Sequence, residues 1–310
     1  MMKKLDKQKV MKLIKILFLI LVTIFLVRYF QRNMEDIKNM DFRINWGVFA
    51  LSMIFYFLYK ISLASLWHYI TWLNHSSIDY PQAITSYLYS ILGKYIPGKV
   101  FMLAARIPGY EAKGVPIRKV TICFFLENIC TLLGAAFLFL ISLFFFPNDL
   151  LKDYMWLTIA FIVIFFICIN PKIINFFLRI LGKWIKKEDL EIPFTYGQMI
   201  QVVLLFILNW VIVGIGFYML VCSIYPLPLS QMLYAGGIFG LSAIIGILSI
   251  FAPSGIGVRE GILVAGLVLV MPSEYAVIIS IISRLWATIA ELLLILFAYI
   301  IQKIKRLAKR

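Results

Sequence analysis

Long apolar stretches limit what this chain can fold into. At least six of them come close to the roughly 20 apolar residues that an α-helix needs to cross a lipid bilayer. Charged residues make up only 15% of the chain, whereas a soluble domain carries about 25%. The polar stretches in between are too short for a separate folded domain. The sequence therefore predicts an all-α, polytopic membrane bundle, with residues 1–310 forming one integral membrane domain.

Basic clusters orient the six full spans that we place along the chain. Lysines precede the first span, so the positive-inside rule puts the N-terminus in the cytoplasm. The basic loops 106–119 and 172–191 and the C-terminal residues 303–310 then fall on the same side. Both termini are therefore predicted to be cytoplasmic. The predicted spans cover residues 10–30, 46–69, 120–146, 154–170, 197–222 and 275–301.

Two further apolar segments, 81–106 and 231–271, contain breaks that a simple span does not carry. The stretch ILGKYIPG at 91–98 returns in approximate form as ILSIFAPS at 247–254. Each copy runs into a Pro-Gly or Pro-Ser-Gly break that is followed by an arginine. Broken helices at matching places in two halves are typical of the substrate sites of secondary transporters. The pattern therefore predicts a transport site where the two broken segments meet.

The first broken segment is predicted to be a re-entrant hairpin, because Lys94 and Lys99 do not suit a continuous apolar span. The second is either a hairpin that turns at 253–255 or two thin spans on either side of that break. Charge does not separate these alternatives. Two hairpins that enter from opposite faces would make the chain a pair of inverted repeats. The halves would then be residues 1–150 and 154–310, approximately.

Basic side chains follow or surround both breaks. Lys94, Lys99 and Arg106 lie around the first, and Arg259 follows the second. A phosphate headgroup needs positive charge and N–H donors in a low-dielectric setting, and a broken helix offers free N–H groups. These residues are therefore candidates for a headgroup site. Alternatively, Lys99 and Arg106 snorkel to the interface, and Arg259 pairs with the adjacent Glu260 in a purely structural contact.

Carboxylates also lie inside predicted spans. Glu127 and Glu291 cost at least a few kcal/mol there unless they are paired or face water. Arg284, seven residues before Glu291, occupies the same helix face. One hypothesis is that a carboxylate exchanges a proton or pairs with a cation during transport; the other is that fixed ion pairs order the bundle. Lys60 is a candidate partner, and Glu127 is a second possible partner of Arg259.

The predicted substrate-binding residues combine the two breaks with these charged groups. Apart from them, Gly236 and Gly240 have a GxxxG spacing, which favours close helix packing. The full predicted set is Lys94, Pro97, Gly98, Lys99, Arg106, Glu127, Pro253, Ser254, Gly255, Gly257, Arg259, Glu260, Arg284 and Glu291.

No cofactor, metal or nucleic acid is predicted. The net charge of +15 reflects basic residues at the ends of apolar segments, which suits membrane topology and anionic lipids rather than nucleic acid. His68 and His75 lack metal-ligand spacing. The chain also lacks a phosphate-binding loop for ATP and a nucleophile with a positioned base, which disfavours an ATP-driven pump and a lipid-modifying enzyme.

Two stretches resemble signature sequences of a known family. SYLYSILGKYIPGKV at 86–100 and APSGIGVREG at 252–261 are similar to those of the lysylphosphatidylglycerol synthase transmembrane, or flippase-like, family. This family includes the membrane half of the bacterial multiple peptide resistance factor, which makes aminoacylated phosphatidylglycerol and moves it to the outer leaflet. The resemblance implies a flippase-like domain in a bacterial or archaeal plasma membrane, with links to lipid metabolism and antibiotic resistance.

Two departures from the family pattern affect this expectation. The family often has Glu-Arg in the helix after the first signature, where this chain has Glu127-Asn128. In the resistance factor, the synthase chemistry resides in a soluble C-terminal domain that uses aminoacyl-tRNA, and this chain stops at Arg310, just past its last predicted span. We therefore do not expect lysyltransferase activity from this polypeptide alone.

The expected function is movement of a lipid between leaflets. The substrate would be an anionic, aminoacylated or glycosylated phospholipid or a polyprenyl-phosphate lipid. The alternative is a membrane subunit or scaffold of a lipid or cell-envelope synthesis system, or a protein that shares the lysyltransferase family without its catalytic domain. A separate synthase or glycosyltransferase partner and a homo-oligomer are both compatible with the sequence.

Overall fold

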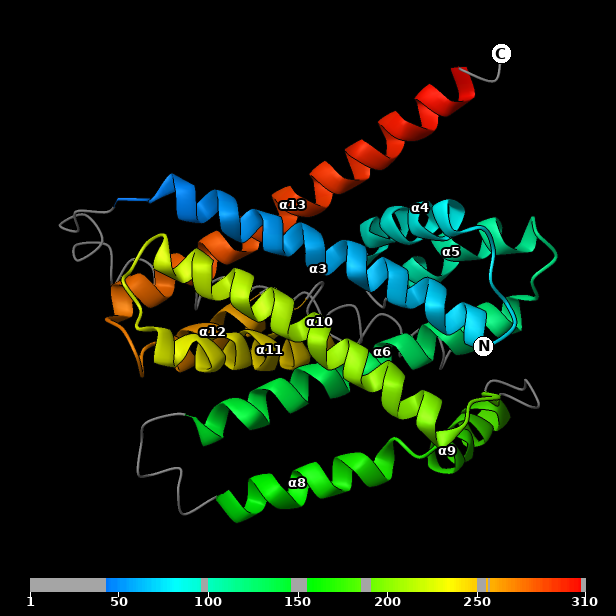
Figure 1. Cartoon of the computed structure of the whole chain (residues 1–310), viewed down its shortest axis with the longest axis horizontal. Coiled ribbons are helices and arrows are strands. Elements are labelled where there is room, and N and C mark those ends of the chain that lie inside the picture. Colours follow the sequence, from blue (N-terminus) through cyan, green and yellow to red (C-terminus); the bar gives the residue numbers. More distant parts are fainter. Residues whose placement is uncertain are drawn as a thin grey trace, which may run out of the picture.

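The structure, a computed structural model, describes residues 43–95, 100–145, 155–184, 191–249, 255 and 257–307. Every regular element in these residues is a helix, which confirms the predicted all-α fold (Figure 1). The α-helices are α3 (Trp46–Leu73), α4 (Tyr80–Ser90), α5 (Val100–Glu111), α6 (Ile117–Phe144), α8 (Met155–Cys168), α9 (Pro171–Trp184), α10 (Tyr196–Cys222), α11 (Met232–Leu248), α12 (Val258–Leu267) and α13 (Ser273–Leu307), with 3₁₀ helices η1 (Ile91–Tyr95) and η2 (Leu229–Gln231).

Five helical segments of the described chain are long and apolar enough to cross a membrane. Four of them, α3, α6, α10 and α13, correspond to predicted spans, and the fifth is η2 with α11. The span predicted over 10–30 lies outside the described residues. At 154–170 the structure has α8, whose 14 residues extend only about 21 Å, short of the roughly 30 Å of a bilayer core.

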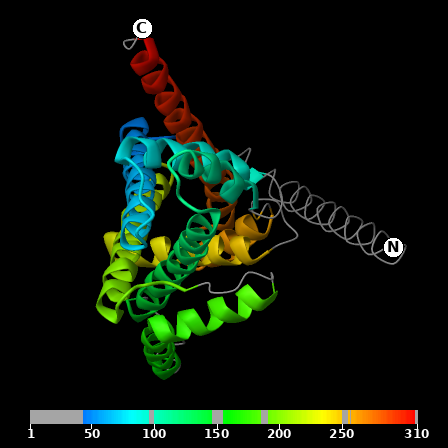
Figure 2. The same cartoon turned by 90° about the vertical axis from the view of Figure 1, so that its right-hand side faces the viewer.

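The centre of the bundle is formed by α3, α6, α10 and α11: α10 packs against the other three, and α6 also packs against α11 (Figures 1 and 2). Small residues allow this close packing. A Cβ added to Gly236 of α11 would lie 3.0 Å from the Cα of Gly214 in α10, and one added to Gly240 would lie 3.2 Å from the Ala135 carbonyl oxygen in α6. The GxxxG pair therefore serves helix packing, as predicted.

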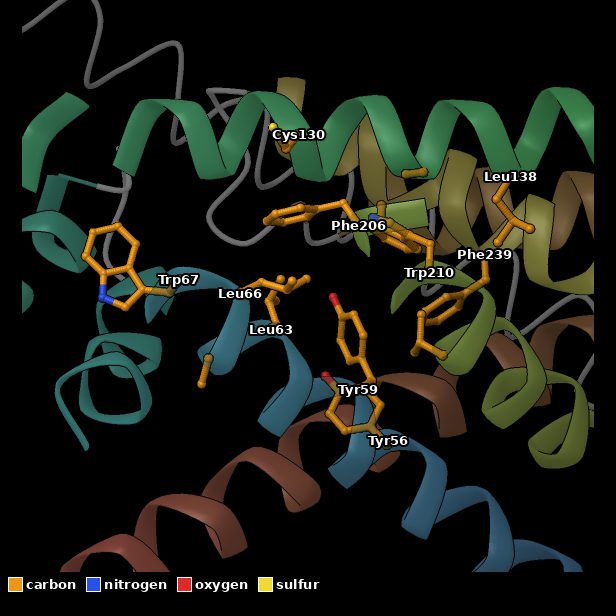
Figure 3. Close-up of a cluster of buried hydrophobic side chains, with 14 of the residues drawn as sticks. Tyr56, Tyr59, Leu63, Leu66, Trp67, Cys130, Leu138, Phe206, Trp210 and Phe239 are labelled. Atoms are coloured by element: carbon orange, nitrogen blue, oxygen red, sulfur yellow. The ribbon is translucent and has the colours of Figure 1, made fainter. Parts of the chain in front are cut away.

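Aromatic side chains fill the space between these helices. Tyr56 and Tyr59 of α3 point into the same core as Phe206 and Trp210 of α10 (Figure 3). The Asn209 side-chain amide donates to the Tyr59 carbonyl over 3.0 Å, which ties α10 to α3 through a buried polar contact. This packing places the inner face of α3 at the centre of the molecule.

The first broken segment forms an antiparallel pair of helices. α4 and α5 pack against each other, and η1 and residues 96–99 connect them. The Ser86 hydroxyl donates to the Arg106 carbonyl over 3.4 Å. Near the connection, a Cβ on Gly93 would lie 2.6 Å from the backbone nitrogen of Met102. The segment is therefore a hairpin of two short helices, which we call the first hairpin.

The second broken segment is also a hairpin, formed by α11 and α12. The Tyr234 hydroxyl donates to the Gly266 carbonyl over 2.9 Å, and Gly255 lies against Gly246 at the other end. α12 has 10 residues and extends only about 15 Å, half of a bilayer core. This geometry favours the hairpin over two thin spans, and we call it the second hairpin.

The loop predicted over 172–191 is wrong for its first part, which is the helix α9. Ile174 and Leu178 lie one turn apart and are buried, whereas Phe176 and Phe177 are 60% and 62% exposed. Apolar residues with helical spacing thus recur between the lysines. A helix with apolar and basic faces is typical of the membrane interface.

Gly93 provides a test of the first hairpin. We expect Gly93→Ala to lower the free energy of unfolding by about 1–3 kcal/mol, since the new methyl group overlaps backbone that cannot move separately. The measurement is thermal or chemical unfolding of the purified protein in mild detergent. Gly109→Ala is the matched control, because its Cβ would be in ordinary contact with Ser86 at 3.5 Å. Equal stability of both variants would contradict the close approach.

Candidate functional site

A buried carboxylate joins α3, η1 and α13. Lys60 Nζ of α3 lies 2.8 Å from Glu291 Oε1 of α13, and Lys94 Nζ of η1 contacts Glu291 Oε2. The Tyr56 hydroxyl donates to Glu291 Oε1 over 3.0 Å. The Glu291 side chain is only 2% exposed, and that of Lys94 is 23% exposed. The first hairpin is thereby attached to two membrane-spanning helices through one carboxylate. We call Lys60, Lys94 and Glu291 the lysine cluster.

Aromatic rings connect the lysine cluster to the second hairpin. The ring centroids of Tyr56 and Trp286 are 4.5 Å apart, and those of Trp286 and Phe239 are 6.1 Å apart. The guanidinium carbon of Arg259 lies 4.6 Å from the Phe239 ring centroid, which is a cation–π contact. Arg259, which follows the second break, therefore faces the same core as Lys94, which lies just before the first.

Arg259 differs from the other basic residues of this region. Among the described residues it has no ion-pair partner, and its guanidinium lies over the Phe239 ring. Glu260, its neighbour in sequence, instead contacts Arg284 Nε over 2.6 Å and accepts from the Gly257 backbone over 2.6 Å. The alternative, a structural pairing of Arg259 with Glu260 or Glu127, is therefore absent from the described residues. A guanidinium without a carboxylate is able to take an anionic ligand.

Glu260 and Gly257 order the turn into α12. Gly257 caps this helix with a φ of 84°, and Gly255 has a φ of 68°, a region that favours glycine. Because Glu260 accepts from the capping residue and pairs with Arg284 of α13, it holds the start of α12 against α13. This contact directs the neighbouring Arg259 toward Phe239.

Arg106 occupies a different environment. Its side chain is fully buried, its Nε donates to the Ser90 hydroxyl over 3.0 Å, and its Nη1 contacts Glu127 Oε2. The guanidinium carbon lies 4.2 Å from the Trp67 ring centroid and 4.3 Å from the Tyr87 ring centroid. Arg106 therefore does not snorkel to the interface. It links both helices of the first hairpin to α3 and α6.

Positive charge exceeds negative charge in this region. Counting described residues only, the buried ion pairs together with Arg259 contain five basic side chains and three carboxylates: Lys60, Lys94, Arg106, Arg259 and Arg284 against Glu127, Glu260 and Glu291. An excess of cations inside an apolar bundle is costly unless an anion compensates it. Of the predicted set, Pro97, Gly98, Lys99, Pro253 and Ser254 lie outside the described residues.

The structure decides between the ion-pair partners that the sequence had left open. Lys60 is a partner of Glu291, as suggested, whereas Arg284 and Glu291 share a helix but pair with different residues. Sequence reasoning missed Tyr56, which donates a hydrogen bond to Glu291, and Ser90, which accepts one from Arg106. No local spacing marks either residue, because each meets its partner only through tertiary packing.

Residues 12–295 match the transmembrane region of lysylphosphatidylglycerol synthase. The chain belongs to this family. No curated protein matches it. The family membership identifies a multi-pass membrane protein and agrees with the resemblance of the stretches 86–100 and 252–261.

The residue after Glu127, which departs from the family pattern, is an asparagine and therefore not an ion-pair partner. Where Glu-Arg is often expected, Asn128 donates to the Phe124 carbonyl over 2.8 Å within α6. Glu127 instead finds an arginine from the first hairpin, Arg106. The carboxylate is thus neutralised by an arginine outside its own helix.

Proposed function

We propose that this protein moves a lipid with an anionic or phosphate-containing headgroup between the leaflets of a membrane. The observation that carries the proposal is Arg259, a guanidinium inside the bundle without a carboxylate partner among the described residues. A phosphate or carboxylate of a lipid headgroup has the charge and geometry to bind it. The lysine cluster nearby offers further N–H donors.

The arrangement of the hairpins supports the same proposal. Lys94 comes from the end of η1 in the first hairpin, and Arg259 from the start of α12 in the second. Residues at discontinuous helices are where secondary transporters bind their substrates. Family membership supports a lipid substrate, since the family is named for lysylphosphatidylglycerol synthesis. In this proposal Arg106 and Glu127 position the first hairpin, and Arg259 and Lys94 meet the headgroup.

The test is leaflet exchange in proteoliposomes that contain the purified protein. Fluorescent phosphatidylglycerol, its lysyl form and a polyprenyl-phosphate lipid are compared for the wild type and Arg259→Ala. We expect exchange of at least one lipid, slowed about tenfold or more in the variant, because a charge-assisted hydrogen bond is worth about 1.5–3 kcal/mol. Arg259→Ala leaves no described carboxylate unpaired, so it is expected to fold.

The matched control is Arg179→Ala on α9. Arg179 is an exposed arginine paired with Glu191, and exposed ion pairs contribute little to stability. Its exchange rate should equal that of the wild type. Absence of exchange for all three lipids with correctly folded protein would contradict the proposal and favour a subunit or scaffold of a lipid or cell-envelope synthesis system. A separate synthase or glycosyltransferase would then be the partner to seek.

A further inference from the structure

A large groove lies between the first hairpin and α13, and no residue of the lysine cluster lines it. Its volume is about 1230 Å³, which exceeds the roughly 300–1,000 Å³ of most small-molecule pockets. Ile61 of α3, Leu88 of α4 and Leu294 of α13 form its apolar part. Ala105 and Gly109 lie one turn apart on α5, and their small side chains leave space on that side of the groove. The groove is therefore open enough for a ligand larger than a metabolite.

The two ends of the groove differ in polarity. Along α13 the lining residues run from Leu294, at the apolar end, to Gln302. The Tyr89 hydroxyl donates to the Gln302 side-chain oxygen over 3.2 Å at this end. Lys303, the next residue, is exposed. The groove thus runs from hydroxyl and amide groups, with Lys303 beside them, to an apolar interior, the order of groups in an anionic phospholipid.

The length of the groove matches one leaflet. Along α13 the lining residues run from Leu294 to Gln302, a rise of about 12 Å. The hydrocarbon part of one leaflet is about 15 Å deep, half of the bilayer core. Leu294 lies one turn beyond Glu291, and Ile61 follows Lys60, so the apolar end adjoins the lysine cluster. An acyl chain in the groove would therefore end beside the lysine cluster.

We propose that this groove binds one acyl chain of an anionic phospholipid, with the headgroup at the end formed by Tyr89 and Gln302, beside the exposed Lys303. The Gln302 amide and the neighbouring Lys303 ammonium complement a phosphate, and the apolar lining complements a hydrocarbon chain. The groove then presents a lipid from one leaflet to the lysine cluster and Arg259. Its role as an entry site rests on the proposed function, whereas lipid binding itself does not.

The test uses phosphatidylglycerol that carries a photoactivatable diazirine in one acyl chain. The full chain is reconstituted in phosphatidylcholine vesicles with this probe, illuminated, and analysed by mass spectrometry for labelled peptides of α4 and α13. Ala105→Phe fills the groove from α5, and Ala104→Phe, at an exposed neighbour that does not line the groove, is the matched control. Labelling should fall about tenfold in the first variant, because an overpacked groove excludes the chain. It should stay unchanged in the second.

A second pair of variants keeps the test independent of α5. Ala298→Trp fills the groove from α13, and Leu296→Trp places the same ring at an exposed position that does not line the groove. Labelling that is uniform over the exposed helix faces, or equal in filled and control variants, would overturn the proposal. Cross-links showing the groove occupied by a second copy or by residues 1–42 would overturn it as well.

Lipid exchange measured in the same vesicles separates this proposal from the proposed function. Groove labelling without exchange would leave the acyl-chain site in place and contradict transport. Exchange that depends on Arg259, without groove labelling, would support transport and overturn the acyl-chain site. Loss of labelling in Ala105→Phe together with slower exchange would support both.

Discussion

Replacing Arg106 by methionine should lower the free energy of unfolding by about 3–5 kcal/mol, the usual cost of leaving one partner of a buried ion pair alone. Glu127 would keep its charge without a counter-ion on the inner face of α6. The guanidinium contacts with the rings of Trp67 and Tyr87 would also be lost. The measurement is chemical unfolding of the purified protein in mild detergent.

The double variant Arg106→Met with Glu127→Met is the informative control. Removing both charges avoids the unpaired carboxylate, so most of the lost stability should return. Arg106→Lys should fall in between, since lysine keeps the charge but not the planar stacking on the two rings. If the single variant is as stable as the wild type, or the double variant is no better than the single one, the buried pair does not hold the first hairpin.

Replacing Glu291 by glutamine should have an effect of similar size, about 3–5 kcal/mol, because Lys60 and Lys94 would both lose the carboxylate between them. The change also loosens the attachment of η1 to α3 and α13. We therefore expect more protease cleavage and faster hydrogen exchange around η1, in addition to a lower unfolding midpoint. These readouts separate a local release of the hairpin from general instability.

Glu274→Gln is the control on the same helix. Glu274 lies in the first turn of α13, where its charge is favoured by the helix dipole by only about 0.3–1 kcal/mol. Removing Lys60 and Glu291 together, as Lys60→Met with Glu291→Met, should recover part of the stability lost in Glu291→Gln. A Glu291→Gln protein with unchanged midpoint and unchanged exchange near η1 would refute the role of Glu291 as the attachment point.

The helices that cross the bundle were predictable because each is a local property of the chain. Apolar length alone identified α3, α6, α10 and α13. α9 was missed because lysines obscured the one-turn spacing of Ile174 and Leu178, whose burial depends on the neighbouring bundle. The prediction thus worked where the membrane decides the structure, and failed where contact with other helices decides it.

The charged residues were also recognisable in the sequence, but their pairing was not. Arg106, Glu127, Arg259 and Glu291 stood out because ionisable groups are costly in apolar segments. Their positions in the sequence allowed more than one ion-pair partner for these residues. The hairpins resolved this choice, since they bring Arg106 to Glu127 and leave Arg259 against Phe239.

By itself, the sequence determined the all-α membrane class, the two interrupted segments and the family of this protein, because apolar length, Pro-Gly breaks and signature residues are read over short stretches. Only the tertiary structure decided which basic side chain pairs with which carboxylate. Tyr56 and Glu291 are 235 residues apart in the chain and hydrogen-bonded in the bundle. Such contacts form only when close helix packing excludes water and buries both groups, which makes an unpaired alternative costly.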